Sequence, residues 1–246
     1  INNIKRWCLW LVDTPPAVLR SMPHVMKRVE AVRAMRISST DAQTQKDAKK
    51  PTQFQKIRQP QRPRYLAIPK VSSERRQFIP IGYLDNEVIC GDKIFFVDDA
   101  SLFTFGVLTS TMHNAWMRQT CGRLESRYSY SNTIVYNNFP WPGFAGEALS
   151  DKHRNAIEQA AQCVLDARAQ FADSSLADLY DPLTMPPALL KAHQKLDAAV
   201  DAAYLSSGGK KSYASDAERV AFLFDLYQRI TSLLPFEAKR PRQHTT

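Results

Sequence analysis

Long apolar runs, paired cysteines and complete catalytic motifs are all missing from this sequence of 246 residues. No apolar run approaches the roughly 20 residues that a helix needs to cross a bilayer, so we expect no membrane partner and a cytoplasmic protein. Cys8, Cys90, Cys121 and Cys163 show no Cys-x-x-Cys spacing, which favours free or buried thiols over disulfides or zinc ligands. Gly208-Gly209-Lys210 lacks the first glycine of a phosphate-binding loop, and no predicted strand precedes it.

Acidic residues are scarce only in the N-terminal part of the chain. Residues 1–64 carry 14 Lys and Arg against 4 Asp and Glu, whereas residues 65–142 carry 7 of each and residues 143–246 carry 12 against 13. The net charge of +9 is therefore concentrated in the first segment. Such a basic segment can follow a phosphate backbone, and a solvated linker of the same composition is the alternative.

Composition divides the chain into four parts. Residues 1–37 are predicted to form a connector, with a strand or buried segment up to residue 12 and a basic helix after it. Residues 38–64 are rich in Ser, Thr, Gln, Lys and Pro and are expected to be a flexible basic linker or loop. Residues 65–142 are strand-rich, and residues 143–246 are Ala-rich and helical. The predicted fold class is α+β: an antiparallel, strand-rich domain braced by helices, followed by a small C-terminal helical bundle.

Alternating residues and turn signals predict the strands of the third part. They are expected at residues 65–69, 77–81, 87–90 and 93–97, with two more within 124–136. Residues 102–120 have helical apolar spacing and are expected to form the brace, with N-cap residues offered by the stretch Asp98–Ser101. Cys121-Gly122 is expected to end this helix in a left-handed cap. His113 has no ligand-forming neighbour at metal-site spacing and is interpreted as a packed residue.

The C-terminal part shows three amphipathic helices. They are predicted at residues 151–172, at 187–204 and from residue 216 to about 234. Ser215 and Glu218 have the spacing of a capping box. A basic tail is expected at residues 239–246.

Hydrogen-bonding side chains are concentrated in two short stretches of the strand-rich part. Arg can bind guanine through two hydrogen bonds, Asn can bind adenine in the same way, and Glu can accept a bond from cytosine. Glu125, Arg127 and Ser129 occupy alternate positions of a predicted strand and are expected to share one side of it. An ordinary hairpin with one hydrated face is the alternative. The candidate DNA-contacting residues are Ser72, Ser73, Arg75, Arg76, Arg123, Glu125, Arg127, Ser129, Ser131 and Asn132.

Residues 122–142 contain the run Gly-Arg-Leu-x-Ser-x-Tyr-x-Tyr-Ser-x-x-x-Val-Tyr-Asn-Asn-Phe-Pro-Trp-Pro. This run resembles the signature of the target-recognition domain in MmeI-like (type IIL) restriction–modification enzymes. Residues 6–11 resemble the segment just after the methyltransferase core of these enzymes, and residues 65–76 resemble the first strand and loop of the recognition domain. Residues 176–182 and 185–189 resemble the C-terminal helical region of the family. The resemblance thus extends in order over nearly the whole chain.

The resemblance implies a sequence-specific double-stranded DNA recognition module. Enzymes of this kind join a nuclease, an adenine-N6 DNA methyltransferase and a recognition domain in one polypeptide, so the expected partners are DNA and those two domains. The chain begins with Ile rather than Met, and we expect it to be part of a longer polypeptide. S-adenosylmethionine is the cofactor expected for that parent enzyme, and no cofactor is expected in this chain.

Motifs that would make this chain catalytic are missing. Neither a glycine-rich S-adenosylmethionine loop nor an Asn/Asp-Pro-Pro-Tyr/Phe motif is present. The prolines of residues 137–142 are not adjacent, and Asp178 and Asp181 have no nuclease-type partner motif. We therefore expect no catalytic, cofactor-binding or metal-binding residue here.

Two other functions are compatible with the sequence. The chain can be a specificity-type subunit that reads DNA as a separate polypeptide. It can also be a structural or interaction domain whose Tyr and Trp side chains meet a protein partner. Salt dependence separates DNA binding from an apolar interface, because only the former releases counterions.

Overall fold

The computed structural model describes residues 4, 6–144 and 148–232. The chain divides into two compact units, an N-terminal unit of Ile4–Gln59 and a main unit that starts at Pro60.

Three helices form the N-terminal unit: α1 (Pro16–Arg20), α2 (Pro23–Ile37) and α3 (Ala42–Asp47). Helices α1 and α2 begin with proline, whose fixed φ suits the first helical turn. The segment expected as a strand or buried element contains no strand among its described residues, and Trp7 is 92% exposed. That expectation is wrong because the apolar residues there line a surface groove instead of pairing in a sheet.

The segment expected as a flexible loop contains α3 and a set of turns held by one arginine. The Arg36 guanidinium donates hydrogen bonds to the carbonyl oxygens of Asp47, Lys50 and Gln53, at 2.9, 2.8 and 2.7 Å. A basic side chain that satisfies three backbone acceptors orders a polar segment without any apolar periodicity. Composition alone therefore missed this helix.

The main unit contains an antiparallel sheet in the order β3-β1-β4. Its strands are β1 (Arg64–Pro69), β3 (Gly82–Asp85) and β4 (Ile94–Asp98). Strand β1 is central and almost completely buried, with Tyr65 and Leu66 at 0% exposure. The strands predicted at residues 65–69 and 93–97 are confirmed. Those predicted at 77–81 and 87–90 are wrong, because the first is buried irregular chain and the second lies in turns.

A second three-stranded sheet carries the signature run, in the order β2-β6-β5. It consists of β2 (Val71–Ser72), β5 (Gly122–Leu124) and β6 (Arg127–Ser129), and a π-helix, η1 (Asn132–Tyr136), follows it. The end of the stretch expected as two strands is therefore helical. The left-handed residue is not Gly122 but Glu125, with φ 57°, because a two-residue hairpin turn requires a positive φ.

The predicted bracing helix consists of two helices, α4 (Leu102–Thr109) and α5 (Thr111–Thr120). Of the stretch Asp98–Ser101, Ser101 is the residue that caps α4, and its hydroxyl accepts a bond from the Thr104 amide at 3.2 Å. The break falls at Ser110, whose hydroxyl caps α5. The carboxylate of Asp197 accepts the Thr111 amide and hydroxyl at 2.6 and 2.7 Å, which fixes the start of the new helix.

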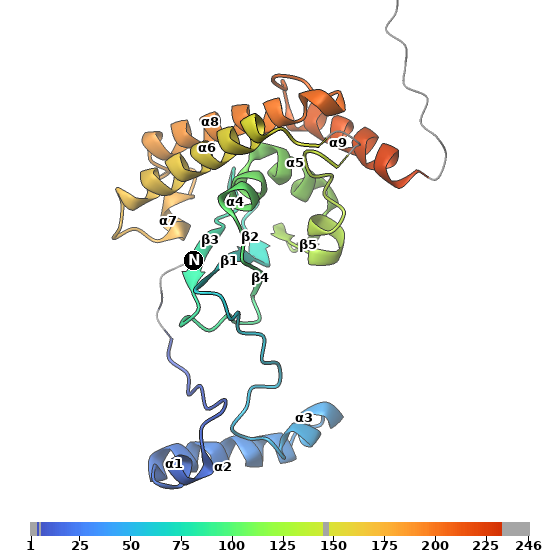
Figure 1. Cartoon of the computed structure of the whole chain (residues 1–246). Coiled ribbons are helices and arrows are strands. Elements are labelled where there is room, and N and C mark those ends of the chain that lie inside the picture. Colours follow the sequence, from blue (N-terminus) through green and yellow to red (C-terminus); the bar gives the residue numbers. More distant parts are fainter. Residues whose placement is uncertain (1–3, 5, 145–147, 233–246) are drawn as a thin grey trace, which may run out of the picture. The chain divides into compact units, whose positions relative to one another are not determined.

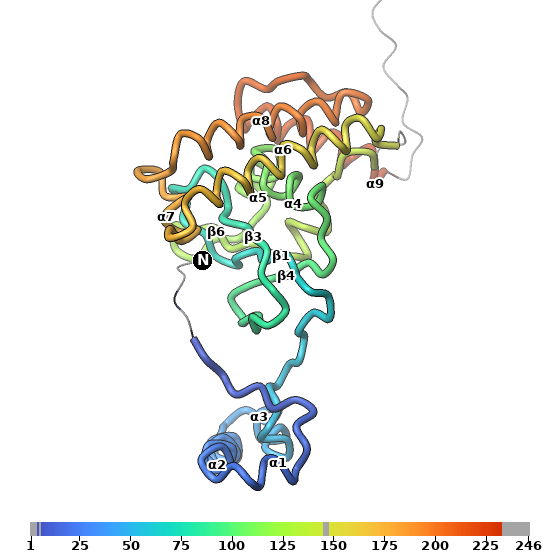
Figure 2. Tube along the Cα trace, turned by 60° about the vertical axis from the view of Figure 1, so that its left-hand side comes forward, coloured from blue at the N-terminus to red at the C-terminus, as the bar shows by residue number. Residues whose placement is uncertain are grey.

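The C-terminal part is helical, as predicted, and its elements are α6 (Asp151–Ala169), α7 (Leu176–Leu179), α8 (Pro187–Ala203), the short 3-10 helix η2 (Leu205–Ser207) and α9 (Asp216–Thr231). Helices α6 and α8 lie side by side over α4 and α5 (Figures 1 and 2). At Gly106 of α4, an added Cβ would lie 2.8 Å from the Ile157 side chain, so glycine allows the close approach of α4 and α6.

Ser215 caps α9 as the sequence predicts, but the second half of the expected capping box differs. The Glu218 carboxylate accepts the Ala214 amide at 2.7 Å and pairs with Lys210. The end predicted for this helix near residue 234 and the basic tail lie outside the described residues. Among the described helices, none is long and apolar enough to cross a membrane. The α+β class with a C-terminal helical region is confirmed.

Candidate nucleic-acid interface

The β5–β6 hairpin divides the candidate residues between two faces of its sheet. Directly opposite residues of an antiparallel pair point to the same side. Leu124 is opposite Arg127, and Val71 is opposite Ser129, so these four residues share one face. The other face carries Tyr128, which is 9% exposed, together with Arg123 and Ser72.

The exposed face presents Arg127 at the end of the hairpin. Its guanidinium donates to the Glu125 carboxylate at 2.7 Å, with the two side chains 45% and 77% exposed. Glu125 lies in the turn between the strands, so the prediction that it shares a strand with Arg127 and Ser129 is wrong for Glu125. The turn still brings its carboxylate to Arg127. An acceptor and a donor for base edges therefore stand next to each other.

Arg123 is on the same face of the sheet as buried Tyr128, but its own side chain is exposed. Its guanidinium lies 4.1 Å from the centre of the Tyr128 ring and donates to the Ser126 carbonyl at 3.3 Å. Because Arg123 is exposed, its charge stays accessible while the aromatic ring limits its rotamers. Ser72 is only 6% exposed, so in this conformation its hydroxyl is covered.

The second candidate stretch follows β2 and joins the hairpin through the sheet. Strand β2 pairs with β6, which places the loop Ser72–Arg76 beside the hairpin. Within the loop, the Ser73 hydroxyl accepts the Arg75 amide at 3.2 Å. Arg75 is exposed, whereas Arg76 is half-buried and donates to the Ala177 carbonyl at 3.4 Å. The two stretches are thus brought together, and Arg75 is the more available of the two loop arginines.

Ser131 and Asn132 lie at the start of the π-helix. The Ser131 hydroxyl accepts the Ile134 amide at 3.3 Å and bonds the Thr133 hydroxyl at 3.0 Å. Ser131 is therefore used as a helix cap, while Asn132 is exposed. Leu124, although apolar, is 49% exposed, because it lies opposite Arg127 on the outer face of the sheet.

His113 is packed, in agreement with the sequence interpretation. Its Nε2 lies 3.1 Å from the Tyr130 hydroxyl, and burial lowers its pKa to about 3. The imidazole is therefore neutral and shielded from solvent, and it bonds Tyr130, the residue that follows β6. Among the residues that the structure describes, no group of three or more His, Cys, Asp and Glu side chains is arranged to hold a metal ion.

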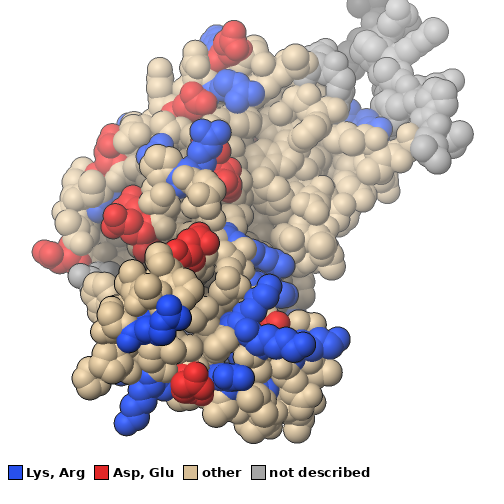
Figure 3. Space-filling view, turned by 60° about the horizontal axis from the view of Figure 1, so that its bottom comes forward, with Lys and Arg blue, Asp and Glu red and all other residues tan. Residues whose placement is uncertain are grey.

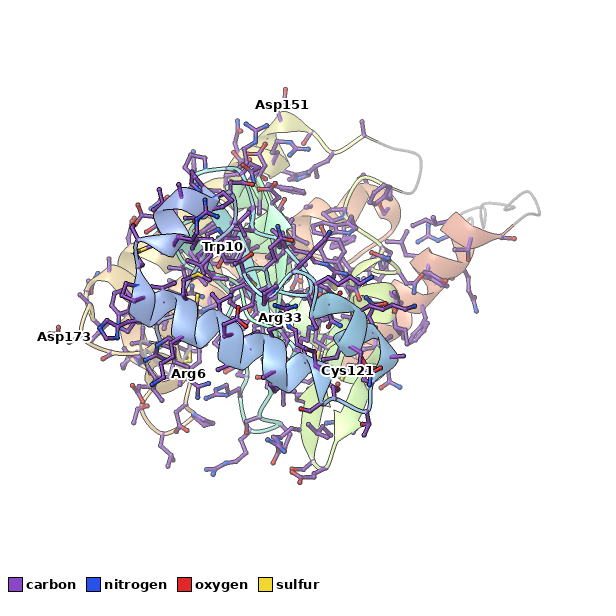
Figure 4. All side chains as sticks on the ribbon, turned by 90° about the horizontal axis from the view of Figure 1, so that it is seen from below. Arg6, Trp10, Arg33, Cys121, Asp151 and Asp173 are labelled. Carbon is purple, nitrogen blue, oxygen red and sulfur yellow. The ribbon has the colours of Figure 1, made fainter. Side chains whose placement is uncertain are left out.

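The N-terminal unit carries the basic surface expected from the sequence. Residues 4–59 hold 12 Lys and Arg against 4 Asp and Glu, and blue side chains outnumber red ones on the lower part of the face in Figure 3. The unit also contains a groove of about 530 Å³ between residues 7–11, α2 and residues 51–54. Trp10, labelled in Figure 4 with Arg6 and Arg33, stacks on Phe54 with ring centres 5.5 Å apart.

These features define the class: an α+β recognition module followed by a helical region. The family model described as "MmeI, target recognition domain" matches residues 1–143, and the model "MmeI, C-terminal domain" matches residues 149–235. The chain belongs to the MmeI family, and its two matched regions are the target recognition domain and the C-terminal domain of that family. The resemblance of the signature run is thereby confirmed.

Two relatives support the assignment. A curated protein called DNA methyltransferase A, from Bacillus subtilis (strain 168), is 37% identical over 231 residues, which are 94% of this chain and 25% of that protein. A solved structure of the type IIL restriction-modification enzyme MmeI in complex with DNA is 48% identical, with a TM-score of 0.88, and is covered over 30% of its length by 95% of this chain. The chain thus spans about a quarter to a third of each relative.

Proposed function

We propose that this chain reads a specific double-stranded DNA sequence for a larger restriction–modification enzyme. The observation that carries the proposal is the shared sheet β2-β6-β5, which puts the loop Ser72–Arg76 beside the exposed pair Glu125 and Arg127. A two-stranded ribbon fits the major groove, where Arg and Glu distinguish guanine from cytosine. The similarity to an enzyme solved in complex with DNA supports this function.

The candidate residues have different tasks in this proposal. Glu125, Arg127 and Ser129 contact base edges, with Ser73 from the neighbouring loop. Arg75 and Arg123 contact phosphates and set the position of the hairpin along the duplex. Asn132 is exposed at the start of η1, and Ser72 is covered. Ser131 caps η1 and Arg76 bonds the Ala177 carbonyl, so these two act mainly by holding the backbone.

The parent enzyme supplies the chemistry. The methyltransferase domain would hold S-adenosylmethionine and the target adenine, and the nuclease domain would follow the same recognition event, in the cytoplasm. The described part of this chain offers only recognition and support. The relatives favour this arrangement over a separate specificity subunit, since each contains the matching region within a chain three to four times longer.

Selection from a random duplex pool tests the proposal. The purified chain should enrich one short word, and its affinity for that word should fall steeply between 50 and 200 mM salt because bound phosphates release counterions. Calorimetric titration with S-adenosylmethionine should show no binding. Enrichment of no sequence, or one-to-one binding of the cofactor, would refute the proposed division of labour.

A further inference from the structure

The segment Gln77–Ile81, here called the anchor segment, directly follows the loop Ser72–Arg76 and is buried from Phe78 onward. Phe78, Ile79 and Ile81 are 1%, 2% and 0% exposed, yet the segment belongs to no strand. Its backbone polar groups must therefore find other partners. Side chains from helices far away in the sequence provide them.

Helix α5 holds one end of the anchor segment. The Ile79 amide donates to the Asn114 Oδ1 at 2.9 Å, and the Arg118 guanidinium donates to the Gln77 carbonyl. Arg118 also pairs with Asp216 of α9 at 2.6 Å. The start of α9 is thereby joined through one side chain to the residue that follows the loop.

Helices α6 and α8 hold the other end. Arg168 of α6 donates to the Ile81 carbonyl and to the Tyr180 hydroxyl, each at 2.8 Å. The same hydroxyl lies 2.7 Å from His193 Nε2, and the imidazole stacks on the Phe78 ring with centres 4.0 Å apart. One network thus connects α6, the end of α7 and α8 to the anchor segment.

Burial of the Arg168 guanidinium is unfavourable for the stability of the fold. Arg168 is 8% exposed, and its described partners are a carbonyl, a hydroxyl and aromatic rings, with no carboxylate within salt-bridge distance among the residues that the structure describes. A buried guanidinium without a counterion costs desolvation free energy that an apolar side chain of similar size would avoid. What the guanidinium adds is a fixed, directional link between two elements.

We propose that Arg168 and Arg118 are positioning residues for DNA recognition, through which the C-terminal helical region fixes the loop Ser72–Arg76. The inference rests on the proposed function, because it assigns the loop a role in reading DNA. It gives helices α6 to α9 a task in specificity although none of their residues need touch the duplex. The contact from Arg76 to Ala177, beside the anchor segment, attaches the loop itself to α7.

The test compares base preferences of variants with matched stability. In Arg168→Met and Arg118→Gln, discrimination should fall about fivefold or more at the base pairs that also respond to Ser73→Ala, the loop residue assigned to base edges. Base pairs that respond to Arg127→Asp should keep their preference. Arg168→Lys, which can reach one of the two acceptors but not hold the fork, should give an intermediate profile.

The matched control is the double variant Asp201→Asn/Arg219→Met. It removes a buried ion pair of 3.0 Å between α8 and α9, and in the described part of the chain neither Asp201 nor Arg219 is hydrogen-bonded to the anchor segment. It should lower the melting temperature and leave every base preference unchanged. If Arg168→Met and Arg118→Gln behave like this control, with an unchanged profile, the positioning role is refuted.

Hydrogen exchange without DNA separates this inference from the proposed function. The amides of residues 73–79 and 81 should exchange faster in Arg118→Gln and Arg168→Lys than in the wild type and the control. Unchanged exchange refutes the anchoring even if the chain reads DNA. Faster exchange in a chain that selects no DNA word supports the anchoring and refutes the proposed function alone. If Arg168→Met does not fold, these two milder variants decide.

Discussion

The Arg127 guanidinium donates to the Glu125 carboxylate at 2.7 Å across the tip of the β5–β6 hairpin. An ion pair this exposed contributes only about 0–1 kcal/mol to stability. Its more important effect is to orient an arginine fork and a carboxylate beside one another before DNA is bound. A base pair can replace this intramolecular bond if it accepts a hydrogen bond from Arg127 and donates one to Glu125.

Replacing Arg127 by Asp should therefore alter the DNA word and leave the fold intact. We expect a changed base preference at one position, or a loss of about 1–3 kcal/mol there, because a carboxylate cannot donate to guanine. Sequencing of methylated sites in cells that carry the full enzyme measures it. Lys93→Asp makes the same change of charge at an exposed position in the turn before β4 and should keep the word. An unaltered word at full activity in Arg127→Asp would place specificity elsewhere.

Glu125 occupies a backbone conformation that favours glycine, with φ 57°. Glu125→Gly should leave the melting temperature unchanged or raise it slightly, since glycine has no Cβ to strain the turn. The same variant removes the carboxylate and should change base preference at the position that responds to Arg127→Asp. Glu125→Asn, which also tolerates this φ, is the control for backbone entropy. A stable Glu125→Gly protein with the original word would show that Glu125 only forms the turn.

The fold could be predicted where apolar residues repeat locally. Strands β1 and β4 and helices α6 and α8 follow such repeats, and the structure confirms them. The anchor segment could not be predicted, because Asn114, Arg118 and Arg168 satisfy its backbone from 35 to 87 positions away. A short apolar run looks like a strand when its long-range partners are unknown.

The candidate interface was predictable as a set of residues but not as a geometry. The pairing of β2 with β6 joins two stretches more than fifty positions apart, and this pairing decides which side chains share a face. It puts Ser72 with buried Tyr128, and Ser129 with the outer residues. The spacing within one strand could not show that Glu125 falls in a turn, because a two-residue loop interrupts the alternation.

The buried carboxyl of Asp197 should make stability depend on pH. Burial is the largest effect and raises the pKa of Asp197 to about 6. The two hydrogen bonds from Thr111 act in the opposite direction and lower the pKa. The charges of Asp201, which raises the pKa, and of Arg219, which lowers it, have smaller effects. The folded state therefore binds more protons than the unfolded state between about pH 4 and pH 6. This contribution is fully present below the unfolded pKa and is lost as the pH rises through 6, by up to about 3 kcal/mol.

Asp197→Asn isolates that contribution. Burial also lowers the pKa of His113 and of His193 to about 3, so these two histidines destabilise the fold as the pH falls below their unfolded pKa. The unfolding free energy of the wild type as a function of pH therefore contains the contribution of Asp197 and the opposite contribution of the two histidines. The difference in unfolding free energy between Asp197→Asn and the wild type should shift in favour of the wild type as the pH drops from 7 to 4. A constant difference, measured by denaturant titration across that range, would contradict the raised pKa.

Removal of single arginines should separate phosphate contacts from structural contacts. Arg75 is exposed, whereas Arg76 is half-buried and bonded to the Ala177 carbonyl. Arg75→Ala should weaken all duplexes about equally and reduce the slope of log affinity against log salt by about one, because one phosphate contact is lost. Arg76→Ala should lower the melting temperature and change the slope less. Arg123→Ala should resemble Arg75→Ala, with an added loss of packing on Tyr128. Affinity titrations at several salt concentrations decide, and an unchanged slope in both Arg75→Ala and Arg123→Ala would place the DNA on another face.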